Sequence, residues 1–137
     1  MDRIKSDVGY VNVVIANAGT PGPRTNPIKA DSSIAKIKEQ LWGASIADFT
    51  HTFDVNVSAV LYTFAAFLEL LDAGNRKKNV EQKSQFIATT SVSAYNRAPM
   101  GSMAYGPSKA ATTQLMKALS TNMAPHGIRA NVISPGC

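Results

Sequence analysis

A tyrosine and a lysine stand four residues apart in the segment Tyr105-Gly-Pro-Ser-Lys109. In a helix, residues at this spacing share one face, so their side chains can interact. A phenol ordinarily titrates near pH ~10, and a nearby ammonium favours its ionised form, which brings the hydroxyl closer to acid–base work at neutral pH. Because chance also produces such pairs, a catalytic assignment needs support from the surrounding elements.

The elements that must position this pair follow one pattern. Three short runs rich in β-branched residues predict strands at 10–16, 85–92 and 128–133. Between them, apolar residues recur at helical spacing over 45–73 and 103–124. Ser45 with Asp48 is typical of a helix start, and Gly74 is expected to end that first long helix. The order predicts an α/β fold with half of a doubly wound, Rossmann-like parallel sheet.

Shorter elements complete the expected fold. Residues 1–8 are expected to be the end of a helix. The Pro- and Gly-rich residues 20–29 and 97–101 are expected to form loops. Apolar residues at helical spacing predict an amphipathic helix over 32–42. Its Trp42 has two interpretations, a place in a pocket wall or buried packing, and packing is favoured.

Polar and glycine-containing segments follow each predicted strand. They are Asn17-Ala18-Gly19, Ser91 to Ser93, and Pro135-Gly136. In parallel α/β sheets, ligands bind beyond the carboxyl ends of the strands. The candidate chemistry is therefore expected to gather at one edge of the sheet.

These segments, with Asn56 in the first long helix and the Tyr105-Gly-Pro-Ser-Lys109 run, occur in one order along the chain. The sequence in this respect resembles the short-chain dehydrogenase/reductase family over residues 8–137. The resemblance implies an oxidoreductase that interconverts a carbonyl and an alcohol with NAD or NADP as cofactor, acting on a small-molecule substrate. It also implies a homo-oligomer for the complete protein, through the two long helices.

The same resemblance implies a role for each catalytic residue. Tyr105 would be the general acid/base, and Lys109 would lower the Tyr105 pKa and bind the nicotinamide ribose. Ser91 would hold the substrate oxygen; Ser93, near the same strand end, is the alternative, and Ser91 is preferred. Asn56 would support a water that links Lys109 to solvent.

Cofactor contacts are implied at two of the strand ends. Asn17, Ala18 and Gly19 would lie along the cofactor, and Pro135-Gly136 would bring backbone close to the nicotinamide, since glycine has no side chain in the way. Tyr105 and Lys109 would also contact it.

The sequence departs from the family pattern at its beginning. Before residue 40 the only glycines are Gly9, Gly19 and Gly22, which lack the spacing of a glycine-rich phosphate-binding turn. We therefore expect a fragment or the product of a truncated gene, with an open apolar strand edge along Val11, Val13 and Ile15. A catalytically inactive remnant or an interaction module is the alternative to an active oxidoreductase.

Length and charge set further bounds. The 137 residues, with 45% hydrophobic residues and a net charge of +5, predict one domain over 1–137. The basic cluster Arg76-Lys77-Lys78 is interpreted as a solvated loop and not a nucleic-acid site.

No apolar run reaches the ~18 residues of a membrane span. No secretory signal and no disulfide partner for Cys137 are seen, and we therefore expect the protein in the cytoplasm. His51 and His126 are interpreted as structural, no metal site is expected, and Cys137 is not a favoured nucleophile.

Overall fold

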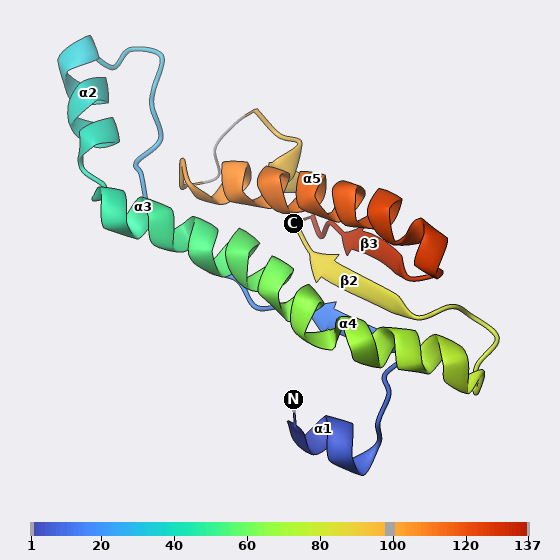
Figure 1. The fold of residues 1–137 in the computed structure, drawn as a ribbon. Coiled ribbons are helices and arrows are strands. Elements are labelled where there is room, and N and C mark those ends of the chain that lie inside the picture. Colours follow the sequence, from blue (N-terminus) through green and yellow to red (C-terminus); the bar gives the residue numbers. More distant parts are fainter. Residues whose placement is uncertain (1, 98–100, 137) are drawn as a thin grey trace.

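The computed structural model describes residues 2–97 and 101–136 and contains a three-stranded parallel sheet (Figure 1). The strands lie in the order β1-β2-β3, with bounds Val13–Ala16, Gln85–Thr89 and Arg129–Ile133. Ile15 of β1 pairs with Ile87 of β2, which pairs in turn with Asn131 of β3. The parallel register and the crossover connections confirm the predicted half of a doubly wound sheet.

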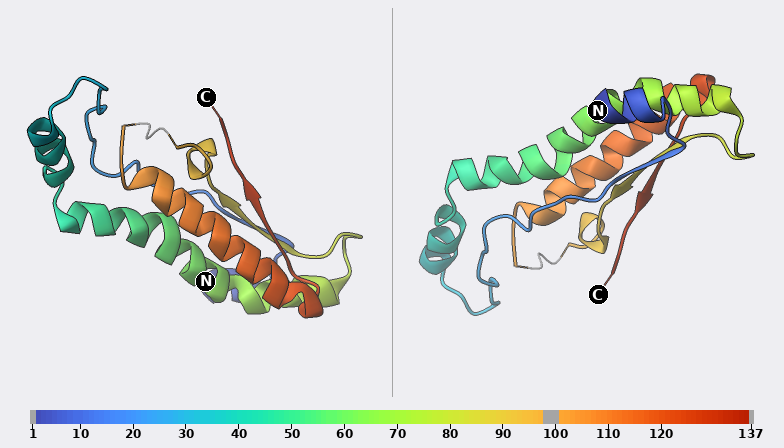
Figure 2. Two further views of the ribbon diagram at one scale, coloured as in Figure 1. Left: turned by 90° about the horizontal axis from the view of Figure 1, so that it is seen from above. Right: turned by 90° about the horizontal axis from the view of Figure 1, so that it is seen from below.

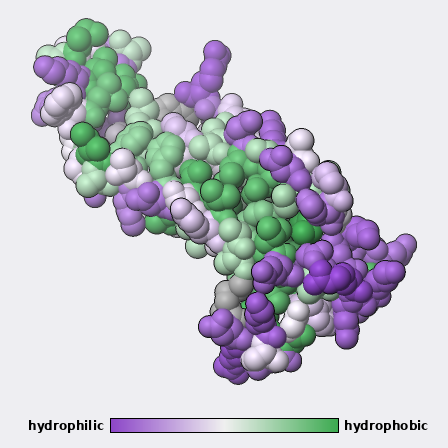
Figure 3. Space-filling model, in the orientation of Figure 1, coloured by the Kyte–Doolittle hydropathy of each residue, from purple (hydrophilic) through white to green (hydrophobic). Residues whose placement is uncertain are grey.

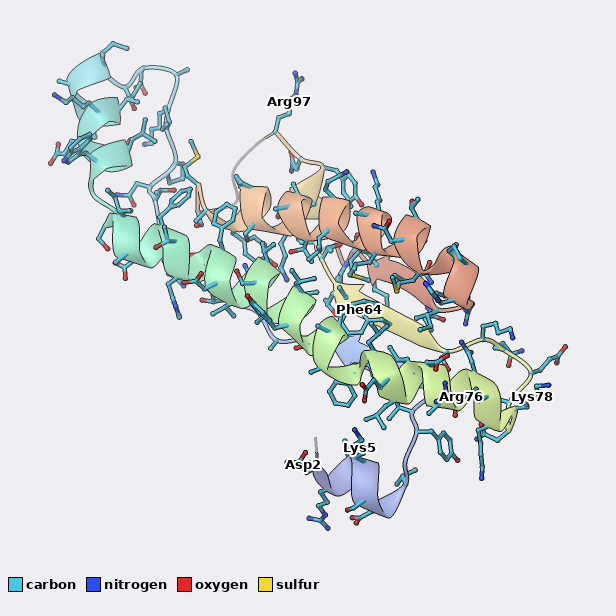
Figure 4. The ribbon with its side chains drawn as sticks, in the orientation of Figure 1. Asp2, Lys5, Phe64, Arg76, Lys78 and Arg97 are labelled. Atoms are coloured by element: carbon cyan, nitrogen blue, oxygen red, sulfur yellow. The ribbon has the colours of Figure 1, made fainter. Side chains whose placement is uncertain are left out.

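Two long helices cover one face of this sheet. They are α4 (Ala59–Lys77), which precedes β2, and α5 (Tyr105–Met123), which precedes β3. The two views of Figure 2 show them side by side on the same side of the strands. Phe64 of α4, labelled in Figure 4, meets Phe86 of β2 edge to face at 5.2 Å between ring centres, and Met116 of α5 joins the same core. Burial of these side chains is the main force that holds helices to sheet.

The first long helix contains one irregular turn. The helix α3 (Ile46–Phe53) runs through a π-helical turn, Asp54–Ser58, directly into α4. Its start is as predicted, because Ser45 Oγ accepts a hydrogen bond from the backbone N–H of Asp48 at 3.1 Å. The π-helical turn carries Asn56, and π turns inside α-helices are frequent at functional sites.

Gly74 does not end this helix, which continues to Lys77 and ends where Lys78 adopts a left-handed conformation, φ 52°. Instead, Gly74 is a point of close contact. A Cβ placed on it would overlap the carbonyl oxygen of Val11 and lie 2.7 Å from Ser84 Oγ. The prediction was wrong because glycine here serves packing between α4 and the segment before β1, which a local pattern does not distinguish from a C-cap.

Most other boundaries move by a few residues. The predicted strands 10–16 and 85–92 are shorter, and a 3₁₀ turn, Val92–Ala94, follows β2. The opening helix is α1 (Asp2–Asp7), and Lys5 on it pairs with Glu69 of α4 at 3.2 Å. Of the predicted loop 97–101, residues 98–100 lie outside the described residues, as does Cys137.

The predicted amphipathic helix is α2 (Ile34–Trp42), capped by Ser33, whose Oγ accepts from the N–H of Lys36. It projects from the body of the molecule (Figure 1). Trp42 is 84% exposed and does not line the large cavity described below, so both interpretations of this residue were wrong. The reason is that α2 has no buried residues; Gln40 and Leu41 line a small cavity together with the loop around Pro27, and Trp42 lies outside it.

The other face of the sheet is uncovered in the described residues. Val13 and Ile15 of β1 are 54% and 58% exposed, and Ile133 of β3 is 52% exposed. Among the described strands, β1 pairs only with β2, so its second edge is open, as predicted. Val11 was wrongly included in the open row, because it precedes β1 and packs partly buried against the core.

Apolar side chains also reach the surface over α2, α4 and α5, whereas the end of α4 near Arg76 and Lys78 is hydrophilic (Figures 3 and 4). Within the described residues, one helix, Ile46–Lys77, is long and apolar enough by length and composition to cross a membrane, contrary to expectation. Core helices of folded domains pass the same test. Val60, Phe64, Leu70 and Leu71 on this helix are buried, so one side of it packs inside the molecule.

Candidate active site

A cavity of about 750 Å³ opens at the carboxyl edge of the sheet. Segments far apart in the sequence form its walls: the loop after β1, the turn after β2, the start of α5 and the residues after β3. The predicted site residues that line it are Asn17, Gly19, Ser91, Tyr105, Lys109, Pro135 and Gly136. Ala18 is exposed and not among the lining residues, and Asn56 lies fully buried behind the wall.

Tyr105 is the first residue of α5, two residues later than the predicted helix start. Ser102 stabilises this start, because its Oγ accepts hydrogen bonds from the N–H groups of Ala104 and Tyr105 at 3.2 and 3.3 Å. These N–H groups would otherwise lack helical partners. The half-buried Tyr105 side chain is thereby held at the mouth of the cavity.

Lys109 lies one helical turn further on, on the same face, as its spacing predicts. Its ammonium is 5.7 Å from the centre of the Tyr105 ring and donates a 2.8 Å hydrogen bond to the carbonyl oxygen of Thr89. The residue is only 4% exposed, and burial lowers the pKa of the Lys109 ammonium from its ordinary value. A buried, singly bonded ammonium beside a phenol is an arrangement suited to proton exchange.

Asn56 connects three parts of the site from the π-helical turn. Its Oδ1 accepts from the N–H of Thr20 at 2.8 Å, and its Nδ2 donates to the Thr20 carbonyl at 2.9 Å and to Ser108 Oγ at 2.9 Å. The backbone carbonyl of Asn56 accepts from Thr112 Oγ1 at 2.7 Å. These contacts join the loop after β1 to α5, which carries Tyr105 and Lys109.

Ser91 and Ser93 both line the cavity. Ser91 Oγ accepts a 3.1 Å hydrogen bond from the N–H of Ser93 and caps the 3₁₀ turn. A hydroxyl that accepts in this way keeps its own proton for donation. The backbone of Ser93 lies against Gly106 of α5, where an added Cβ would be 3.0 Å from the Ser93 carbonyl oxygen.

The segment after β3 is fixed to the turn after β2. The N–H of Val92 donates to the carbonyl of Pro135 at 3.0 Å, and the hydroxyls of Thr90 and Ser134 lie 2.6 Å apart. On the other side, Thr89 Oγ1 donates to Asn17 Oδ1 at 2.9 Å. The three strand ends therefore form one connected rim.

Several residues of the site were missed by sequence reasoning. The Thr89 carbonyl and Thr112 act through contacts with distant segments, for which no local signal exists. Ser102 could have been found as a hydroxyl just before a predicted helix. Gly22 stands between two prolines in a predicted loop, which is a signal that the sequence offers. In the structure it has φ +74°, and a Cβ there would lie 2.6 Å from Thr52 Oγ1, so glycine is favoured.

No cluster of three or more metal-ligating side chains occurs within residues 2–97 and 101–136. His51 and His126 are both exposed and lie outside the cavity lining.

Comparison with known sequences matches the whole chain to one family. The family profile described as short chain dehydrogenase covers residues 1–137. A short-chain dehydrogenase/reductase of Diaporthe leptostromiformis is 41% identical over 134 residues, which are 98% of this chain and 46% of the relative. One from Stachybotrys chartarum is 41% identical over 150 residues, covering 99% of this chain and 55% of the relative. The chain thus spans about half the length of the curated relatives it matches.

Solved structures show the same fold. An NADH-dependent reductase complexed with NAD has a TM-score of 0.80 at 22% identity, with 99% of this chain and 50% of that chain covered. The Pseudomonas aeruginosa RhlG complex with NADP has a TM-score of 0.74 at 24% identity, with 98% and 46% covered. The fold agrees with the profile match over the full length, and we conclude that this chain belongs to the short-chain dehydrogenase family.

Proposed function

We propose that this chain forms the catalytic half of a nicotinamide-dependent oxidoreductase that interconverts a carbonyl and an alcohol. The observation that carries the proposal is the single cavity onto which Tyr105, Lys109 and Ser91 all open, at the carboxyl ends of the strands. Family membership and the geometry of the Tyr105–Lys109 pair support it.

The cavity is consistent with a nicotinamide and its ribose. Gly19 keeps space beside the lysine, since a Cβ there would lie 3.2 Å from both Lys109 Nζ and Asn56 Oδ1. We propose that Asn17 and Gly19 hold one side of the group and Pro135-Gly136 the other, with Lys109 bonded to the ribose; Ala18, which does not line the cavity, is left out of this set. Bound there, the cofactor would supply or accept the hydride. NAD and NADP both remain within this proposal.

The remaining chemistry belongs to side chains of this chain. In reduction, the Tyr105 hydroxyl donates its proton to the substrate oxygen, and in oxidation the phenolate takes it back. The Lys109 ammonium lies beside this phenol, 5.7 Å from the centre of its ring. Ser91 donates a hydrogen bond to the same substrate oxygen and orients it; Ser93 is the alternative donor. The side-chain amide of Asn56 is bonded to Thr20 and Ser108, so we propose that Asn56 holds this wall of the cavity in place. The family resemblance implies that it also supports a water relay.

The test is Tyr105→Phe in a full-length protein that contains this chain, with turnover followed through the absorbance of NADH or NADPH. We expect a loss of about 10²-fold or more in turnover, with cofactor binding largely intact. Tyr95→Phe is the matched control, because Tyr95 is 62% exposed and outside the cavity lining. Undiminished turnover by Tyr105→Phe would rule out the proposed role.

A second candidate is a chain that keeps these residues without catalysing a reaction. It is favoured by the open edge of β1, which among the described strands pairs only with β2. The uncovered sheet face and the open edge of β1 would then bind a partner carrying further strands. Titration of the purified chain with NADH and NADPH separates the candidates, because saturable binding at micromolar concentration contradicts the second.

The proposal extends to assembly in the complete protein. Leu61 and Tyr62 on α4 are 39% and 73% exposed, and they offer apolar surface for a second copy. Light scattering of the full-length protein tests this, and a monomer at all concentrations would contradict it.

A further inference from the structure

The loop after β1 brings an arginine to the cavity. Arg24 is among the lining residues, together with Thr25 and Asn26. The described lining contains no Asp or Glu, and its only other charged side chain is Lys109. Lys109 donates a hydrogen bond to the Thr89 carbonyl. Among the described residues, Arg24 forms no side-chain hydrogen bond or ion pair.

This loop is held in place at several points, so Arg24 is carried on a fixed backbone. Thr20 is bonded twice to Asn56, and the N–H of Thr25 donates to the carbonyl of Gly101 at 2.9 Å. Between them, Gly22 lies tightly against Thr52 and Ser102. The loop therefore runs from the end of β1 to the segment before α5. Arg24 lies next to Thr25, where the loop is bonded to that segment.

We propose that Arg24 is a specificity-determining residue that binds an anionic oxygen group, a carboxylate, on the substrate. This inference rests on the proposed function, whose reacting carbonyl would lie at Tyr105. Arg24 is exposed and lines a cavity whose lining lacks acidic side chains, and a guanidinium without a protein acceptor attracts an anion and can bind both oxygens of a carboxylate. The substrate class is accordingly a keto acid and the corresponding hydroxy acid.

The anion could also come from the cofactor, whose phosphates carry the same charge. The experiment therefore measures both by NMR shifts of the ¹⁵N-labelled chain. The substrate probes are acetoacetate and 5-oxohexanoate, each compared with its methyl ester, which removes the charge and keeps the carbonyl. The cofactor probes are NADH and NADPH. The variants are Arg24→Gln and, as a matched control with the same change of charge, Arg97→Gln; Arg97 points away from α5 in Figure 4 and is not part of the cavity lining.

We expect at least one acid to bind about tenfold or more tightly than its ester, and Arg24→Gln to abolish this preference while Arg97→Gln retains it. Equal binding of acids and esters by the unaltered chain, or no saturable shift with either acid, would overturn the inference. A preference for the acid over its ester that remains in Arg24→Gln would also overturn the inference. So would a loss of affinity in Arg24→Gln that affects only NADH or NADPH, because this would assign Arg24 to the cofactor. The Tyr105→Phe result is independent of these outcomes, so failure of this inference is distinguishable from failure of the proposed function.

Discussion

The side-chain amide of Asn56 pairs with both backbone groups of Thr20, through hydrogen bonds of 2.8 and 2.9 Å. This pairing resembles one rung of a β-ladder, made by a side chain from a π-helical turn. It satisfies the backbone of a loop that has no strand partner there. Breaking it would leave the N–H and C=O of Thr20 without this partner and would remove the bond that Ser108 Oγ accepts, although Ser108 Oγ would still donate to the Tyr105 carbonyl.

Asn56→Ala is therefore expected to lower the free energy of unfolding by about 3 kcal/mol, because several hydrogen bonds are lost together. Chemical denaturation measures the change. Asn79→Ala is the control, since Asn79 makes one exposed hydrogen bond, to the Tyr10 hydroxyl, and its loss should cost less than about 0.5 kcal/mol. Equal effects of the two substitutions would show that the Asn56 contacts do not stabilise the fold.

Gly74→Ala is expected to destabilise the chain by about 2 kcal/mol, because the added methyl overlaps the Val11 carbonyl and approaches Ser84. Gly43→Ala provides the contrast. Gly43 has φ −69°, and its nearest backbone oxygen would be 3.4 Å from the new Cβ, so the substitution should be neutral or stabilise by up to about 1 kcal/mol. Thermal unfolding of both variants measures the two effects, and a stabilised Gly74→Ala would contradict the close contact between Gly74 and Val11.

Phe64→Ala is expected to cost about 3 to 5 kcal/mol, because the ring is 3% exposed and packs edge to face on Phe86. Tyr62→Ala on the same helix removes a side chain that is 73% exposed and should cost less than about 1 kcal/mol. Urea unfolding of the two variants measures the difference. A small effect at Phe64 would mean that α4 is not held by this contact.

Burial of Lys109 gives a dependence of stability on pH. The pKa of its ammonium is lowered in the folded chain from the ordinary value of 10.5, so between the two values the unfolded chain binds more protons. Stability should consequently rise with pH through this range, as the penalty of the buried charge disappears. Comparison with Lys109→Met isolates this contribution, because other titrating groups are common to both proteins.

The measurement is the difference in unfolding free energy between the unaltered chain and Lys109→Met, from neutral pH toward 10.5. We expect the difference to move in favour of the unaltered chain as pH rises. A difference that is constant, or that moves the other way, would contradict the lowered pKa.

The sequence by itself determined the types and the order of the main elements. Hydroxyl and acidic caps such as Ser45 with Asp48, β-branched runs and helical spacing are signals between near neighbours, so they act before the chain folds. The same local information placed Tyr105 and Lys109 on one helix face. Together with the order of the strand-end segments, it also predicted that the candidate site residues would meet at one edge of the sheet.

The tertiary structure decided what depends on contact between distant segments. Gly74 proved to be a contact with Val11 and not a helix end, and Trp42 is exposed because α2 projects from the body. The Thr89 carbonyl that binds Lys109 and the loop contacts that bring Arg24 to the cavity have no local signature. Such features arise from close approach of backbones that are separated by many residues, and only the packed fold specifies which groups approach.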